Sequence, residues 1–348
     1  MQKLLDTLVR ISGLRDREKM NFTLVQLTME TELWTVTAAR LVRAVGQPGQ
    51  QRWFTLARME AGASEPTCDR SWVDDAALPS LAEFPHREAA IVTEAMVRTG
   101  SGPFTSVFPI DTHTMVCSLL ELVSDEPLSA PVQAQIESVV WIYQNLQGLL
   151  DYGEKDALTE LLNRKSFDSA FHRAAVEQQR DSNPNQPDRR ANHTAGHFWL
   201  AVLDIDHFKR VNDNFGHLIG DEVLLLMARL MRTSFRSHDL LYRFGGEEFV
   251  VLMRCADEAD AAIPLERFRV SAETHVFPQV GTITVSIGFA PLRSDDTPSS
   301  AFGRANQAVY YAKTHGRNQV CSYRALVQSG TLEEAPDAIE DIEDIDFF

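Results

Sequence analysis

The spacing of apolar residues predicts a mixed set of helices and strands in the first 155 residues. Apolar positions recur at helical spacing over residues 2–12 and about 16–45, and a strand-like run follows at Trp53–Ala57. Prolines, serines and aspartates predict loops from about 61 to 86. The other elements expected in this part are a helix near Glu88–Arg98, strands at Ser106–Ile110 and Met115–Val123, and a long helix at about Ala130–Lys155.

The long helix carries apolar residues in a heptad pattern. They step by three, four, three and four residues and are Ile136, Val139, Tyr143, Leu146 and Leu150. This spacing is typical of a stalk that pairs two copies of a chain. An amphipathic helix inside its own domain explains two heptads nearly as well. We favour the stalk, because the reaction inferred below requires two copies.

The rest of the chain alternates strands and helices around one very apolar strand, Phe198–Leu203. Such a run is typical of a central strand that is buried on both faces. The preceding stretch, 181–197, begins with a polar, Pro- and Asn-rich run and predicts a mobile surface loop. The other expected elements are a helix ending near Arg180, helices at 221–235, 257–275 and 300–315, a hairpin around residue 245, and strands at 283–289 and 319–323. This order predicts an antiparallel-containing sheet covered by helices.

Two glycines, Gly245-Gly246, separate the strand-like runs Leu240–Phe244 and Phe249–Met253. The pattern predicts a β-hairpin whose turn, lacking Cβ atoms, lets another backbone or a phosphate approach closely. Glu247-Glu248 follows the turn at once. Paired carboxylates at this place suit a hard divalent cation that also binds phosphate. A solvated hairpin tip is the alternative interpretation.

A second pair of acids lies at the end of the apolar strand, in Asp204-Ile205-Asp206. Acidic side chains at the end of a buried strand are favoured places for metal ligands. Two aspartates that only cap the strand explain the pattern equally well.

The composition is that of an ordinary globular protein, with 348 residues, 44% hydrophobic and 24% charged. The chain is long enough for two domains. No apolar run approaches the roughly 18 residues that span a bilayer, and the amino terminus has no signal-peptide pattern. The four cysteines show no metal-binding spacing, and neither His86 nor His113 is spaced as a ligand. We expect a cytoplasmic protein whose cysteines are reduced and whose two histidines are structural or surface residues.

The net charge of −16 argues against general binding to nucleic acid, which requires a basic face. Part of this charge is local, because residues 331–348 hold eight carboxylates and no Lys or Arg. The remainder, with 33 basic and 41 acidic side chains, has a net charge of −8. We expect residues 326–348 to form an acidic, disordered tail.

Four motifs in order resemble the GGDEF family, the diguanylate cyclases. They are Asp156–Arg164, the block from Asp204–Lys209 through Asn212 to Asp221, the GGEEF form Gly245–Phe249, and Lys313–Asn318. The resemblance covers residues 154–325. It implies a palm-like fold related to nucleotide cyclases and polymerases, and an enzyme that condenses two GTP into cyclic di-GMP and two pyrophosphates.

The resemblance also implies residue roles. Mg²⁺, with Mn²⁺ as the alternative, would be held by Asp204, Glu247, Glu248 and the carbonyl of Ile205. Residues for the triphosphate are Lys209, Lys313, Arg317 and the backbone at His207 and Phe208. Asn212 and Asp221 would read the guanine edge, which favours guanine over adenine. The catalytic residues would be Glu247, Asp204 and Lys209, with Glu247 a candidate to assist deprotonation of the 3′-hydroxyl.

The resemblance further implies an assembly and an inhibitory site. Because each half-site holds one GTP, two copies must face each other in a homodimer. Arg236-Ser237-His238-Asp239 matches the family's R-x-x-D site for inhibitory cyclic di-GMP, and Arg267 resembles its additional arginine. A salt bridge at a helix end is the alternative interpretation of R-x-x-D.

The order of elements in residues 1–150 resembles a GAF-type sensory domain, with a PAS-like or unrelated α+β domain as alternatives. The expected chain is therefore α/β (α+β), with this input domain joined by the helix at 130–155 to the cyclase domain at 154–325. The signal that it senses, a small molecule or a protein, is unknown. A catalytically silent receptor of cyclic di-GMP is the second function, and a scaffold acting through the acidic tail is the third.

Overall fold

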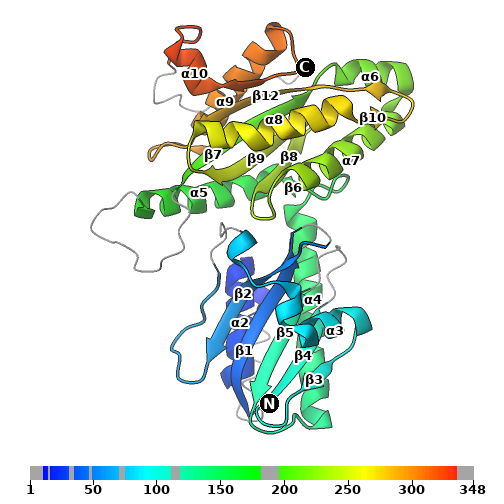
Figure 1. The fold of residues 1–348 in the computed structure, drawn as a ribbon, viewed down its shortest axis with the longest axis vertical. Coiled ribbons are helices and arrows are strands. Elements are labelled where there is room, and N and C mark those ends of the chain that lie inside the picture. The colour runs from blue at the N-terminus through cyan, green and yellow to red at the C-terminus, as the bar shows by residue number, and fades with distance from the viewer. Residues whose placement is uncertain are drawn as a thin grey trace. The chain divides into compact units, whose positions relative to one another are not determined.

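The computed structural model describes residues 11–14, 16–30, 35–46, 49–69, 75–110, 118–181 and 196–334. The chain divides into two compact units, 1–153 and 154–348 (Figure 1). Each unit has its own sheet and its own core. None of the helices in the described ranges is long and apolar enough to cross a membrane.

The first unit is built on a five-stranded antiparallel sheet. Its strand order is β2-β1-β5-β4-β3. In chain order the elements are α2 (Arg17–Glu30), β1 (Val36–Val45), β2 (Arg52–Glu60), the 3₁₀ turns η1 (Asp75–Ala77) and η2 (Leu81–Glu83), α3 (Pro85–Thr93), β3 (Val97–Thr99), β4 (Phe104–Ile110), β5 (Ser118–Ser124) and α4 (Ala130–Glu154).

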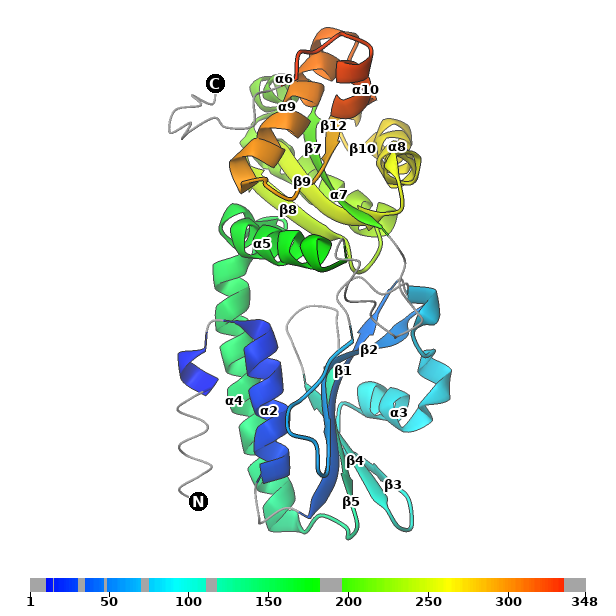
Figure 2. The same cartoon turned by 90° about the vertical axis from the view of Figure 1, so that its left-hand side faces the viewer.

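Helices cover both faces of this sheet. On one face α2 and α4 bury a large apolar cluster that includes Leu24, Leu41, Leu120 and Tyr143. On the other face α3 packs over a smaller cluster around Trp53. Figure 2 shows α2 beside α4 and α3 on the opposite side of the strands. The predicted mixed α/β architecture is confirmed, whereas the GAF-like assignment stays a prediction.

The predicted helix over about 16–45 is only half right. Residues 17–30 form α2, but residues 36–45 form β1, a strand paired on both edges. Both faces of β1 are covered, with Ala39 and Leu41 in the α2–α4 cluster and Val42 and Ala44 in the cluster under α3. Consecutive buried pairs, such as Ala38-Ala39 and Leu41-Val42, therefore imitate helical spacing. The burial of both faces explains the wrong prediction.

The apolar heptad of the long helix packs inside the first unit. Ile136, Val139 and Tyr143 are buried in the α2–α4 cluster, and Leu146 and Leu150 pack against it. The Tyr143 hydroxyl also donates to Asn21 Oδ1 at 2.5 Å. Burial of Ile136, Val139 and Tyr143 within the first unit supports the intradomain alternative for this heptad, and the stalk stays a prediction.

The second unit is built on a six-stranded mixed sheet with the order β13-β12-β7-β9-β8-β6. The two outer pairs, β12–β13 and β6–β8, are parallel and the others antiparallel. The elements are β6 (Leu162–Asn163), α5 (Arg164–Asp181), β7 (His197–Ile205), α6 (Phe208–Phe215), α7 (His217–Ser234), β8 (Leu240–Gly245), β9 (Glu248–Cys255), α8 (Glu258–Thr274), β10 (Val276–Phe277), β11 (Gly281–Thr282), β12 (Val285–Pro291), α9 (Pro298–Thr314), β13 (Val320–Ser322) and α10 (Tyr323–Gln328).

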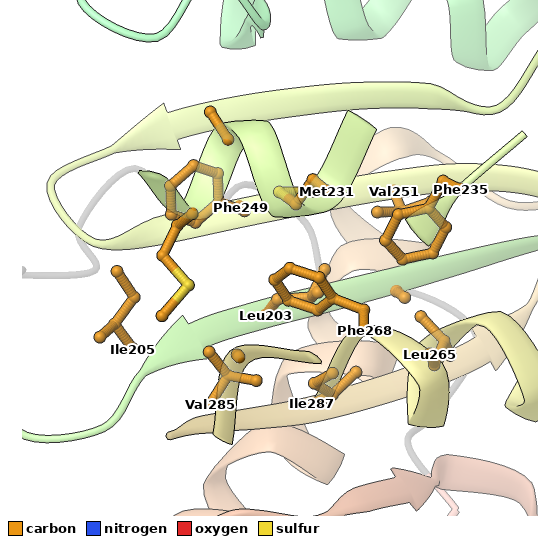
Figure 3. Close-up of a cluster of buried hydrophobic side chains, with 14 of the residues drawn as sticks. Leu203, Ile205, Met231, Phe235, Phe249, Val251, Leu265, Phe268, Val285 and Ile287 are labelled. Carbon is orange, nitrogen blue, oxygen red and sulfur yellow. The ribbon is translucent and has the colours of Figure 1, made fainter. Parts of the chain in front are cut away.

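The central strand β7 is buried on both faces, as its apolar run predicts. On one face α7 and α8 close a core in which Leu203, Met231 and Phe268 meet (Figure 3). On the other face α9 packs closely on β12 at Gly288. A Cβ on this residue would stand 2.2 Å from the Ala305 carbonyl oxygen, so the close approach requires glycine. This packing fixes the strand ends that carry the candidate site.

Several predictions fall outside the described residues. They concern most of the helix at 2–12, His113, most of the loop at 181–197 and most of the acidic tail.

A buried charged cluster lies between α3 and the sheet of the first unit. Arg87 donates Nε and one terminal nitrogen to the two oxygens of Glu121, at 2.7 and 3.0 Å. His86 Nε2 lies 3.0 Å from Glu121 Oε2, and Arg40 donates to Oε1 at 3.2 Å. Burial alone would raise the pKa of Glu121, but Arg87, His86 and Arg40 hold it at about 2.

This cluster predicts a dependence of stability on pH. Because the pKa of Glu121 is lower in the folded chain, its contribution is complete above the unfolded pKa of about 4.5 and is lost as pH falls toward 2. Glu121→Gln should reduce the free energy of unfolding on the order of 3 kcal/mol at pH 7 and far less near pH 2. Urea unfolding at both pH values measures this difference.

The matched control is Glu88→Gln, which removes an exposed carboxylate from α3, the helix that carries Arg87. It should leave the free energy of unfolding nearly unchanged at both pH values. An equal loss for Glu121→Gln at pH 7 and at pH 2 would contradict the assigned charge interaction.

Candidate active site

The candidate site lies where β7 ends beside the β8–β9 hairpin. The antiparallel register of β7 and β9 places Asp204 opposite Glu248. Gly246 has a φ of 51°, which closes the predicted hairpin turn in a left-handed conformation and leaves Glu247 directly after it. Strand pairing therefore gathers three predicted carboxylates at one end of the sheet, with Ile205 as the last residue of β7.

Asp204 is the most enclosed of the three carboxylates, with 13% of its side chain exposed. Its Oδ2 lies 2.7 Å from Lys313 Nζ. Its Oδ1 is buried and has no hydrogen-bond partner among the residues that the structure describes. Burial raises the pKa of Asp204, and the Lys313 ammonium opposes the rise.

The hairpin carboxylates share this environment. Burial, and then the negative charge of Asp204, raises the pKa of Glu247 to about 7 and that of Glu248 to about 7. Lys313 opposes both shifts. The three carboxylates thus share the Lys313 ammonium, and within the described residues only Glu248 is also influenced by Arg164, which makes the site receptive to a further cation.

The donor set fits a divalent cation that is shared with a phosphate ligand. Within the described ranges no three His, Cys, Asp or Glu side chains lie close enough to hold a metal ion by themselves. The orphaned Oδ1 of Asp204, the two hairpin carboxylates and the carbonyl of Ile205 are hard oxygen donors of the kind Mg²⁺ prefers. Phosphate and water oxygens commonly complete such a coordination shell.

The start of α6 provides an anion site next to this strand end. His207 precedes the helix with a φ of 61°, a left-handed turn that leads the chain from β7 into α6 at Phe208. Backbone N–H groups at a helix N-terminus attract phosphate. Lys209 lies in the first turn of α6, and it forms no ion pair with Asp204 or the hairpin carboxylates within the described residues.

A glycine brings the two candidate guanine-reading residues onto adjacent helices. Asn212 lies on α6, and Asp221 follows Gly220 on α7. A Cβ on Gly220 would stand 2.0 Å from Asn212 Oδ1, so the amide lies directly against the backbone of α7. The sequence showed Gly220 as part of a motif, but its role in seating Asn212 depends on the packing of the two helices.

The closing motif reaches the site from α9. Lys313, in the last turn of α9, supplies the ammonium beside Asp204. Arg317 lies in the following turn at a φ of 61°, without an ion pair to the carboxylates in the described part of the chain. Asn318 is tied to α8 by hydrogen bonds with Arg269, at 2.7 Å, and Glu273, at 2.8 Å.

Asp206 is a positioning residue that the sequence left unassigned. Its carboxylate is 95% buried and accepts from the hydroxyls of Thr284 and Ser286, each at 2.7 Å, and from the Asn318 backbone N–H at 3.0 Å. These bonds join the β7–α6 turn to β12 and to the closing motif. The alternating hydroxyls of Thr284 and Ser286 were the available sequence signal.

The opening motif of the second unit holds the hairpin. Arg243 donates to the Gly246 carbonyl at 2.9 and 3.1 Å and to Asp156 Oδ1 at 3.0 Å. Asp156 also accepts from the backbone and hydroxyl of Thr159. The residues just after α4 are thereby connected to the turn that carries the carboxylates.

The three residues predicted for an inhibitory site form a separate group at the C-terminal end of α7. Asp239 accepts from the Arg236 backbone N–H at 2.9 Å and is itself buried. Arg267, on α8, donates Nε to the carbonyl of Ser234 at 2.9 Å. The carboxylate of Asp239 thus has a structural role in the turn, while the Arg236 side chain is exposed.

Comparisons with known proteins agree with these motifs. Residues 154–319 match the family described as diguanylate cyclase, GGDEF domain. The diguanylate cyclase DgcP of Pseudomonas aeruginosa is 35% identical over 206 residues, which are 56% of this chain and 29% of that protein. The response regulator PleD of Caulobacter vibrioides is 35% identical over 211 residues, 57% of this chain and 43% of that protein. The chain thus spans less than half the length of these two relatives.

Among solved structures, the GGDEF domain of DgcB from Caulobacter crescentus in complex with c-di-GMP is 33% identical. The similarity covers 49% of this chain and 96% of that structure, with a TM-score of 0.44. The family match and these sequence identities coincide with the segment that carries all four motifs. Through residues 154–319, the chain carries a domain of the GGDEF family.

Proposed function

We propose that the second unit is a diguanylate cyclase, which condenses two GTP into cyclic di-GMP and two pyrophosphates. The observation that carries this proposal is the group of Asp204, Glu247 and Glu248 around Lys313 at the end of β7. Its uncompensated carboxylates suit a metal-bound triphosphate. The relatives named diguanylate cyclase support the same reaction.

Mg²⁺, or Mn²⁺ in its place, would be held by Asp204, Glu247, Glu248 and the carbonyl of Ile205. When bound, such an ion neutralises triphosphate charge and lowers the barrier to displacement at the α-phosphate.

The chain's own cations bind the rest of the triphosphate. Lys313 exchanges its contact with Asp204 for the β- and γ-phosphates, and Lys209 and Arg317 add positive charge. The backbone N–H groups at His207 and Phe208 complete the phosphate cradle at the start of α6.

Asn212 and Asp221 select the base. A carboxylate accepts hydrogen bonds from guanine N1–H and N2–H, which adenine lacks, and the amide both donates and accepts. GTP is therefore the substrate, and cyclic di-GMP rather than a mixed dinucleotide is the product.

The reaction needs two sites. The 3′-hydroxyl oxygen of one GTP bonds to the α-phosphorus of the other, the bond to pyrophosphate breaks, and the hydroxyl proton leaves to Glu247 or solvent. Repeating the step in the opposite direction closes the ring. Because the product is two-fold symmetric, two copies of the chain form an isologous homodimer.

The group of Arg236, Asp239 and Arg267 is proposed to bind cyclic di-GMP as an inhibitor. The exposed guanidinium of Arg236 can pair with guanine or phosphate. Asp239 orients this turn through its bond to the Arg236 backbone.

The first unit is proposed to be a GAF-like sensory domain. Its antiparallel sheet, covered by helices on both faces, supports an input role. The second candidate function is a silent receptor that binds cyclic di-GMP at Arg236 without turnover. The grouped carboxylates at the end of β7 favour the enzyme, because a receptor has no need of them.

The first test is incubation of the purified protein with GTP and Mg²⁺, with the nucleotides resolved by chromatography. Glu247→Gln removes one charge at nearly constant volume and should lower cyclic di-GMP formation by about 100-fold or more. Asp295→Asn is the matched control, because it removes an exposed carboxylate of the same unit. Binding of cyclic di-GMP without any product from the wild type would favour the receptor.

The contact between the Asn212 amide and Gly220 predicts an effect on the use and selection of GTP. Gly220→Ala places a Cβ where the Asn212 amide lies, so the amide must move. We expect kcat/KM for GTP to fall by about tenfold or more and the preference for GTP over ATP to weaken.

Gly303→Ala serves as the control, because no atom lies within 4 Å of its added Cβ on α9. Circular dichroism checks that both variants are folded. Unchanged selectivity in a folded Gly220→Ala protein would argue against the assigned role of Asn212.

Product inhibition provides the third test. Arg236→Ala leaves the structural carboxylate of Asp239 in place and should raise the cyclic di-GMP concentration for half inhibition by about tenfold or more, with the uninhibited rate unchanged. Arg229→Ala, an exposed change on the preceding helix α7, should alter neither quantity. Equal inhibition of the wild type and Arg236→Ala would remove this turn as the inhibitory site.

A further inference from the structure

We propose that Arg269 and Glu273 are positioning residues of the candidate active site, which hold Arg317 toward the triphosphate through the side chain of Asn318. Arg269 and Glu273 lie on α8, whereas Arg317 and Asn318 follow α9 in the closing motif. None of the four sequence motifs includes α8. The inference rests on the proposed function, because it takes the triphosphate as the ligand of Arg317.

The turn that presents Arg317 has an unfavourable backbone conformation. Gly316, Arg317 and Asn318 have φ angles of 112°, 61° and 45°. Glycine adopts such angles freely and asparagine tolerates them, but an arginine in the left-handed region is uncommon and costs free energy. Such a conformation persists only where surrounding contacts hold it. Contacts on both sides of Arg317 are therefore needed to present its exposed side chain.

Contacts with α9 hold the start of this turn. The Arg317 backbone N–H donates to the Ala312 carbonyl at 2.9 Å. The Gln319 side chain reaches back and donates to the carbonyls of Ala312 and His315, at 3.0 and 2.8 Å. These bonds satisfy carbonyl groups at the end of the helix.

Asn318 holds the end of the turn. Its amide oxygen accepts from a terminal nitrogen of Arg269 at 2.7 Å, and its amide nitrogen donates to Glu273 at 2.8 Å. Its backbone N–H donates to the buried carboxylate of Asp206 at 3.0 Å. Because both ends of the amide are engaged, the side chain cannot rotate without breaking a hydrogen bond. The direction of the chain at Arg317 is therefore set from α8 as well as from the turn that follows β7.

Arg269 is itself held in one orientation. The nitrogen that donates to Asn318 also donates to Glu273 at 2.8 Å, so these three side chains form a closed ring of hydrogen bonds. The other edge of the guanidinium donates to Glu266 at 2.7 and 2.9 Å. Only 13% of the Arg269 side chain is exposed. A planar guanidinium is preorganised for such a network, and a lysine ammonium is not.

This ring reduces the cost of binding a nucleotide. An exposed arginine that is free to move loses conformational freedom when it pairs with a phosphate, whereas a turn fixed beforehand has lost much of that freedom already. Because the β- and γ-phosphates are bound in the ground state as well as in the transition state, the effect should appear in the affinity for nucleotide and in KM, with kcat nearly unchanged.

The test is the affinity of the full chain for 3′-deoxy-GTP with Mg²⁺, measured by titration calorimetry. This nucleotide lacks the attacking hydroxyl, so it binds without forming product. Glu273→Ala should raise the Kd by about fivefold or more. The side chain of Glu273 is 41% exposed, so its removal leaves no buried cavity.

Glu266→Ala is the matched control. It removes the same charge from the same helix and also a partner of Arg269, but within the described ranges Glu266 forms no hydrogen bond with Asn318. It should change the Kd by less than about twofold. Equal weakening by Glu266→Ala and Glu273→Ala would overturn the proposal, because the loss would then follow the charge of α8 and not the contact with Asn318.

Two further variants test how Arg269 acts. Arg269→Lys keeps the positive charge but loses the planar fork, so it should weaken binding by at least as much as Glu273→Ala. Wild-type affinity in Arg269→Lys would show that the charge alone matters. In an Arg317→Ala background, Glu273→Ala should add less than about twofold, because it acts through the missing side chain. Fully additive effects would contradict the positioning role.

Hydrogen exchange without nucleotide separates this inference from the proposed function. The amides of Arg317 and Asn318 donate to Ala312 and Asp206, so a peptide covering residues 313–319 should exchange about tenfold faster in Glu273→Ala than in the wild type. Unchanged exchange would overturn the positioning role, whatever the wild type binds. Faster exchange together with a wild type that binds no 3′-deoxy-GTP would instead overturn the proposed cyclase and the phosphate-binding role of Arg317.

Discussion

The end of β7 concentrates more negative charge than the neighbouring Lys313 ammonium neutralises. The fold of the second unit brings these charges together. Strand register sets Asp204 opposite Glu248, and the hairpin turn places Glu247 next to them. Burial makes the charges expensive, which is why the pKa values of both glutamates rise to about 7. Such a site persists because the packing of the surrounding sheet and helices holds the carboxylates in place despite their repulsion.

That support comes from buried polar bonds as much as from apolar packing. Asp206 stands two residues from Asp204, but its carboxylate faces Thr284, Ser286 and the Asn318 backbone. The two aspartates of this short motif, Asp204 and Asp206, therefore have different roles. Asp204 presents an oxygen that has no partner among the residues described, and the oxygens of Asp206 are engaged in holding three segments together.

Local patterns predicted the second unit well. The hairpin at Gly245-Gly246, the buried strand at 198–203 and the helices of this unit depend on short-range spacing, and the structure confirms them. Strand β1 has consecutive buried residues because helices cover both of its faces, so the sequence alone suggested a helix there. The heptad of α4 left a stalk and an intradomain helix both open, since spacing shows that a face is apolar but not what covers it. The roles of Asp206 and Gly220 required the fold.

The bonds from Asp156 to Arg243 and from Arg243 to the Gly246 carbonyl have a consequence for how far the second unit can be shortened. Asp156 stands near the boundary between the units, where a trimmed domain would be cut. A fragment that begins after this residue keeps every candidate ligand and loses the anchor of the turn that presents them. The domain boundary is therefore set by the geometry of the hairpin, about ninety residues further along the chain, rather than by where the first strand begins.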